Sequence, residues 1–167
     1  MLKFASKCEP VPAALELVYQ AGFRHTELWL NAAVLADWPT ALRHTQDYPL
    51  SYALHFPNSL NLAPETLEQT VALYRGVAAR CVIIHQPMFD RYAEALLRLE
   101  PALALAIETH NLTPEQFDRW AERGPGLTLD VEHLWKYTLR NAPLNVLLFD
   151  AWRRQRGYGG PRGDAGR

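Results

Sequence analysis

Side chains that can bind a metal ion or move a proton recur at regular places in this 167-residue sequence. They are His55, His85, Glu108, Asp130 and His133. The first four each close a short, mainly apolar run, and these runs are residues 52–55, 82–85, 106–108 and 128–130. Imidazoles and carboxylates are the usual protein ligands of zinc, manganese and iron, and oxygen-rich sets favour manganese or magnesium. The repeated placement predicts a metal or catalytic site with a divalent ion: manganese, zinc, magnesium or cobalt.

Each of these residues also has a purely structural interpretation. A lone histidine at the end of a strand commonly hydrogen-bonds to the backbone, and Glu108 can form an ion pair with an arginine. Asp130 followed by His133 can stabilise a turn as an Asx cap. The hypothesis of a functional site therefore depends on the set, because repetition at four successive strand ends rarely arises by chance.

The segments between these positions alternate between two patterns. Short apolar runs predict strands at residues 2–6, 26–30, 50–56, 81–84, 103–107 and 127–129. Longer amphipathic runs predict helices that begin near residues 12, 32, 64, 89, 113 and 141. Prolines in the first helical turn and a capping box at 113–116 support several of these starts. Six strand–helix units in strict alternation predict an α/β fold with a parallel sheet.

Two parallel architectures fit this order, an open doubly wound sheet and a (β/α)8 TIM barrel. A dinucleotide-binding sheet has a glycine-rich turn after its first strand, but residues 7–10 here are Lys-Cys-Glu-Pro. That absence favours the barrel, in which the carboxyl ends of all strands share one face. A complete barrel of this kind takes about 250 residues. We therefore expect an incomplete TIM barrel of about six units over residues 1–152, with unpaired edge strands through which a homodimer can form.

Composition excludes several classes of protein. Hydrophobic residues make up 49% of the chain and the net charge is -1, which excludes wholesale disorder and gives no basic surface for general nucleic-acid binding. No apolar run approaches the ~18–20 residues that cross a bilayer. Two cysteines form no disulfide framework, which favours a cytoplasmic location. Residues 153–167 hold five arginines and five glycines and are expected to be structureless; an RGG-like nucleic-acid tail is the alternative.

Further polar and aromatic residues are secondary candidates. Glu27, within the second predicted strand, either points into the barrel or faces a basic partner. Trp29 and Trp135 can stack on a sugar or base, or belong to the core. Asn111 follows Glu108 closely and can orient it. Trp29, Trp135 and Asn111 are the predicted substrate-binding residues.

Four motifs together resemble the xylose-isomerase-like TIM barrels, a superfamily that includes sugar-phosphate isomerases and epimerases and endonuclease IV. They are His-Phe-Pro-Asn-Ser-Leu-Asn-Leu at 55–62, Val-Ile-Ile-His-Gln-Pro at 82–87, Ile-Glu-Thr-His-Asn at 107–111 and Leu-Asp-Val-Glu-His at 129–133. The resemblance covers residues 1 to about 140. It implies metal ligands at His55, His85, Glu108, Asp130 and His133, with Glu108, His85 and His133 also catalytic. The seventh strand with a histidine and the eighth with a glutamate, which family members have, are not found.

This resemblance leaves three alternatives, two activities and an inactive chain. The first is a divalent-metal-dependent isomerase or epimerase of a sugar or sugar phosphate, in which the metal polarises substrate oxygens. A carboxylate, either Glu108 or the late glutamate that is not found, then transfers a proton. The second is a zinc phosphodiesterase of the endonuclease IV type, which cleaves abasic DNA. The third is an inactive, truncated barrel, since an incomplete ligand set binds metal poorly.

Overall fold

The computed structural model of this chain describes residues 5–108, 119, 122 and 126–128. The chain divides into two compact units, residues 1–108 and 109–167. In the second unit a short strand, β6, spans Gly126–Thr128, close to the expected position. The expected domain boundary after residue 152 lies outside the described residues, as do the expected helices that begin near residue 113 and residue 141.

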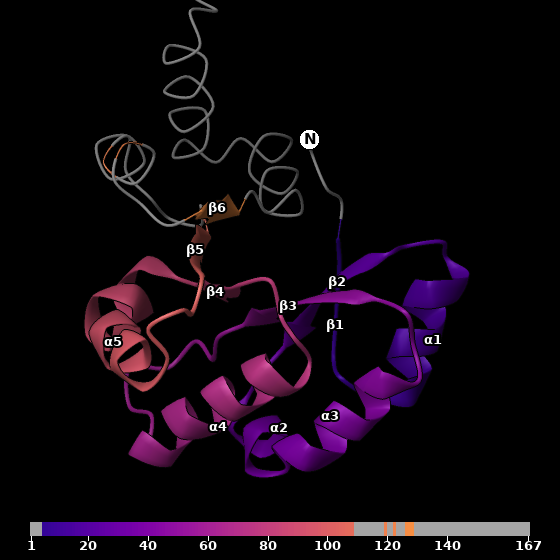
Figure 1. Cartoon of the computed structure of the whole chain (residues 1–167), viewed down its shortest axis with the longest axis horizontal. Helices are drawn as coiled ribbons and strands as arrows, with labels where there is room; N and C mark the ends of the chain where they lie inside the picture. The colour runs from indigo at the N-terminus through magenta and orange to yellow at the C-terminus, as the bar shows by residue number, and fades with distance from the viewer. Residues whose placement is uncertain (1–4, 109–118, 120–121, 123–125, 129–167) are drawn as a thin grey trace, which may run out of the picture. The chain divides into compact units, whose positions relative to one another are not determined.

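Five parallel strands form the sheet of the first unit, side by side in chain order (Figure 1). They are β1 (Ser6–Cys8), β2 (His25–Trp29), β3 (Ser51–His55), β4 (Val82–Ile84) and β5 (Leu105–Glu108). Each neighbouring pair is parallel. The predicted α/β alternation is thus confirmed for these units. No strand pairing joins β1 to β5 within residues 5–108, so this sheet is not closed into a barrel.

Five helices connect these strands and lie along one side of the sheet (Figure 1). They are α1 (Pro12–Gln20), α2 (Ala32–Ala36), α3 (Trp38–Gln46), α4 (Pro64–Gly76) and α5 (Gln86–Leu99). The sequence predicts one helix over residues 32–45, and this is wrong, because the chain breaks between α2 and α3 at Asp37. Pro39, just beyond that break, has no backbone N–H to donate, and its ring would clash with the preceding turn of a continuing helix. Proline does fit the first turn of a new helix.

Two other boundaries also differ from the prediction. The helix expected from residue 89 begins at Gln86, since Pro87 is accommodated in its first turn. The sequence predicts the first strand at residues 2–6, whereas within the described residues β1 spans Ser6–Cys8. This polar strand is held by cross-strand contacts that hydrophobicity does not reveal. Ser6 donates a hydrogen bond from its hydroxyl to Thr26 Oγ1 at 3.1 Å, and Lys7 lies opposite Glu27 in the register.

The two faces of the sheet differ in chemistry because side chains alternate along each strand. On the helix-covered face the side chains are buried and mostly apolar: Thr26, Leu28, Tyr52, Leu54, Val82, Ile84, Leu105 and Ile107. Tyr52 donates its hydroxyl to the Thr45 carbonyl oxygen at 2.8 Å and so joins β3 to α3. Burial raises the pKa of this phenol to about 12. The opposite face carries the polar residues considered next.

None of the helices within the described residues is both long enough and apolar enough to cross a membrane. Cys8 and Cys81 are both free thiols, and burial is the main cause that raises the pKa of each.

Candidate metal centre

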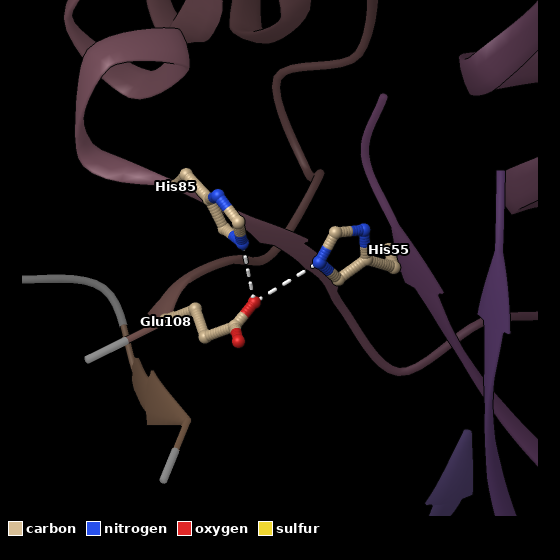
Figure 2. A group of neighbouring side chains, drawn as sticks. All are labelled: His55, His85 and Glu108. Atoms are coloured by element: carbon tan, nitrogen blue, oxygen red, sulfur yellow. Dashed lines mark hydrogen bonds and ion pairs between the residues drawn. The ribbon is translucent and has the colours of Figure 1, made fainter. Parts of the chain in front are cut away.

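Three of the predicted site residues come from the ends of three adjacent strands. His55 is the last residue of β3, His85 directly follows β4, and Glu108 is the last residue of β5. Because parallel neighbours end at the same edge of a sheet, these side chains are brought together. Figure 2 shows both imidazoles pointing toward the Glu108 carboxylate.

One carboxylate oxygen accepts hydrogen bonds from both histidines. The distance from His55 Nε2 to Glu108 Oε2 is 3.0 Å, and that from His85 Nε2 to the same oxygen is 2.7 Å. The two rings meet edge to face with their centroids 5.1 Å apart. One ligand atom from each residue lies within 4.8 Å of the others. This group can therefore hold a metal ion, as the sequence predicted for these three residues.

The cluster is largely withdrawn from solvent. His55 and Glu108 are 3% and 1% exposed, and the His85 side chain is 13% exposed. Burial raises the pKa of Glu108, but its hydrogen bonds from His55 and His85 and the charge of Lys7 outweigh burial, and the net effect lowers that pKa. Glu108 is thus held as a carboxylate, which is the form that ligates a metal.

A second charged pair, Lys7 and Glu27, adjoins this cluster from β1 and β2. The Lys7 ammonium lies 3.1 Å from Glu27 Oε1 and 3.9 Å from Glu108 Oε2. Glu27 Oε1 is also 4.0 Å from His55 Nε2. Burial raises the pKa of Glu27, and the neighbouring charges of Lys7 and His55 oppose this only in part. The two interpretations of Glu27 are therefore compatible, since it faces a basic partner and also borders the site.

Lys7 is the residue of this site that sequence reasoning missed. The predicted first strand ends at residue 6, which puts Lys7 in the turn that follows, whereas Lys7 lies in the middle of β1. The sequence holds only a weak signal for its role. Neighbouring parallel strands pair in chain order, so a lysine in the first strand can form a salt bridge with a glutamate in the second. Locating it needed the register, which places Lys7 opposite Glu27.

Trp29 is the predicted substrate-binding residue that the structure describes. It ends β2, is 42% exposed and lies opposite His55 in the register of β2 and β3. Its indole is therefore available beside the cluster and does not belong to the core. The remaining predicted site residues lie outside the described residues: Asn111, Asp130, His133 and Trp135.

The donor set fits a divalent transition metal. Two imidazole nitrogens and one carboxylate oxygen are a common ligand set for catalytic zinc, in which a further position stays open for water or substrate. Imidazole also suits iron and cobalt, whereas magnesium prefers oxygen ligands. Upon metal binding each Nε2 must present its lone pair, so its proton moves to Nδ1. His55 Nδ1 is buried and has no hydrogen-bond partner among the described residues.

Comparison with known proteins adds no family assignment, because no family model and no curated protein matches the sequence. The resemblance to the xylose-isomerase-like barrels therefore rests on the four sequence motifs. Of the five ligand positions that it implies, His55, His85 and Glu108 are brought together in the described part of the chain.

Proposed function

We propose that this chain is a divalent-metal-dependent isomerase or epimerase that acts on a sugar or sugar phosphate. The observation that carries the proposal is the convergence of two Nε2 atoms and one carboxylate oxygen at the carboxyl ends of three parallel strands. In parallel α/β barrels catalytic sites are built at this end. A bound divalent ion supplies Lewis acidity, which makes a carbon-bound proton next to a carbonyl easier to remove.

The surrounding residues divide the remaining tasks. His55, His85 and Glu108 would hold the ion, and Glu108 is a poor proton acceptor because its pKa is lowered. The expected use of Glu108 as both ligand and proton shuttle is therefore less favoured than its use as a ligand. Glu27 is the described carboxylate next to the cluster, 4.0 Å from His55, and is the better placed proton acceptor. The exposed indole of Trp29 offers a flat apolar surface for a sugar ring.

Proton exchange with solvent tests this function directly. The chain loaded with manganese, cobalt or zinc is incubated in deuterium oxide with a panel of aldoses, ketoses and their phosphates. Nuclear magnetic resonance then detects deuterium at the carbon next to the carbonyl. We expect exchange with at least one substrate, and its loss in His85→Asn, which removes one ligand. Metal-loaded protein that exchanges no proton on any of these sugars contradicts the proposal.

A zinc phosphodiesterase is the second candidate, and the nitrogen-rich donor set favours it. Two histidines and one glutamate suit zinc, which activates water for hydrolysis of a phosphodiester. The net charge of -1 counts against it, because DNA binding depends on neutralising phosphates. Cleavage of a duplex with one abasic site by the zinc-loaded chain would favour this function over the isomerase. An undamaged duplex of the same sequence is the control.

The alternative of an inactive chain is tested by metal analysis. If the ligand set is too incomplete to hold an ion without the late ligands, the purified protein dialysed against trace metal contains well under one equivalent. We expect about one tightly bound equivalent, and its loss in Glu108→Gln.

A further inference from the structure

The ammonium of Lys7 lies between two carboxylates of the site. It is 3.1 Å from Glu27 Oε1 and 3.9 Å from Glu108 Oε2. The second of these oxygens is the one that both histidines contact, so Lys7 already reaches the ligand atom of the proposed centre. About a third of the Lys7 side chain is exposed, against 1% of that of Glu108. Lys7 is therefore a partly exposed cation within reach of a buried ligand atom.

Metal binding and this contact of Lys7 oppose one another. A divalent ion on Glu108 Oε2 would lie within a few ångströms of the ammonium, and like charges at that distance repel strongly where little water screens them. Glu27 gives the ammonium another partner at 3.1 Å, so Lys7 can leave Glu108 without becoming an unpaired charge. Lys7 is consequently both a competitor of the ion and a cation that stays beside it.

The sum of charges indicates what such a site attracts. With neutral histidines, a divalent ion and Lys7 together exceed the two carboxylates of Glu27 and Glu108 by one positive charge, counting the described residues. An ammonium is a strong point donor for carboxylate and phosphate oxygens. A ligand that brings one anionic oxygen to the metal would therefore find a second cation next to it.

From this geometry we propose that Lys7 is a second cation of the metal centre, which weakens metal binding and contacts an anionic oxygen of a metal-bound ligand. This inference rests on the metal centre of the proposed function. It adds the chemical class of the ligand, a small molecule with a carboxylate or phosphate group. The alternative is that Lys7 and Glu27 form only a cross-strand ion pair that stabilises β1 against β2.

The test measures two affinities that should change in opposite directions. Cobalt is titrated into the full-length chain and followed by its visible absorption; the cobalt-loaded protein is then titrated separately with acetate and with methyl phosphate. In Lys7→Met we expect cobalt to bind roughly tenfold more tightly than in wild type. Of acetate and methyl phosphate, the anion that wild type binds more tightly should bind the variant roughly tenfold more weakly. General damage to the site would weaken both. The anion that binds wild type more tightly identifies the class of ligand.

Two variants serve as controls. Lys7→Arg keeps the positive charge and should stay close to wild type in both titrations. Arg98→Met makes the same change in net charge at an exposed ion pair with Glu94, and should alter neither affinity more than about twofold. If both shifts appear in Arg98→Met as well, long-range charge explains them and the inference is overturned.

The remaining outcomes separate this inference from the proposed function. If Lys7→Met binds cobalt and both anions as wild type does, the metal centre stands and the role of Lys7 is overturned. If neither protein binds cobalt, the centre itself is wrong and both proposals are overturned. Should Lys7→Met fail to fold, Glu27→Gln provides an independent test, because Lys7 then keeps Glu108 as its remaining anionic partner. We expect weaker cobalt binding in Glu27→Gln, and equal or tighter binding overturns the inference.

Discussion

The two faces of the five-stranded sheet are built on opposite principles. The face toward the helices consists of side chains such as Leu28, Leu54 and Ile84, each with no exposed surface. The other face carries Glu108, buried at 1% exposure and held by hydrogen bonds from two histidines. On the first face burial itself supplies the free energy of folding. On the second, burial of a charge is unfavourable and must be offset by specific partners.

This difference separates stability from function. Apolar packing tolerates neighbours of many shapes, whereas the polar cluster has a defined geometry that a metal ion can use. Successive side chains of a strand point to opposite faces, so a single strand contributes to both. In β3, Leu54 packs against the helices and His55, the next residue, belongs to the polar cluster. A substitution on one face should therefore alter the free energy of unfolding, and one on the other face should alter metal affinity.

The largest expected effect on stability is from Leu54→Ala. Removing this fully buried side chain leaves a cavity against the helices, and should lower the free energy of unfolding by about 2–5 kcal/mol. Urea denaturation monitored by circular dichroism measures this change in the free energy of unfolding. Lys7→Met on the opposite face is the matched control and should alter stability by about 1 kcal/mol or less. Equal losses in both variants would show that the two faces do not differ in this way.

The largest expected effect on metal binding is from Glu108→Gln. The amide keeps the size of the side chain but loses the negative charge that attracts a divalent ion and one strong ligand. We expect metal affinity to fall by roughly a hundredfold or more. Mutating a residue that only hydrogen-bonds to a metal ligand already lowers affinity by about 10- to 100-fold, and removing a ligand should cost at least as much. Isothermal titration with zinc measures it, and Leu54→Val on the helix-covered face is the control. An unchanged affinity in Glu108→Gln would remove the basis of the metal centre.

Most of the sheet in the first unit could be predicted from the sequence, because apolar runs of strand length mark buried parallel strands. The convergence of His55, His85 and Glu108 could also be predicted, since parallel strands end at one edge. What the sequence could not provide was the polar strand β1 and its register with β2. Lys7 was therefore missed, because its role depends on a contact with residues 20 and 101 positions further along the chain.

The two faces should also respond to opposite extremes of pH. The pKa of Glu108 is lowered in the folded protein, so its contribution to stability is present above about pH 4.3 and is lost as the pH falls. The pKa of Tyr52 is raised to about 12, so its contribution is present below about pH 10 and is lost as the pH rises toward 12. Each contribution is of the order of 2 kcal/mol.

Denaturation curves at a series of pH values test this contrast. Glu108→Gln should flatten the profile on the acid side and leave the alkaline side unchanged. Tyr52→Phe should do the reverse. The phenolate absorption of Tyr52 near 295 nm, obtained as the difference between wild type and Tyr52→Phe, should appear only near pH 12. If either variant flattens both sides, the two groups are coupled through the sheet and the faces are not independent.

A smaller effect on stability than that of Leu54→Ala is expected from Trp29→Ala, at the end of β2 beside the histidine–glutamate cluster. With 42% of its surface exposed, Trp29 is only partly buried, so the free energy of unfolding should fall by about 1–2 kcal/mol, less than for the fully buried Leu54. If the indole receives the sugar, as the proposed function requires, the Michaelis constant should rise several-fold while metal affinity stays the same. Trp29→Phe keeps an aromatic surface and should restore most of the substrate affinity. A stability loss as large as that of Leu54→Ala would contradict this expectation, because it would show that the indole packs as tightly as a core side chain although it lies on the face of His55.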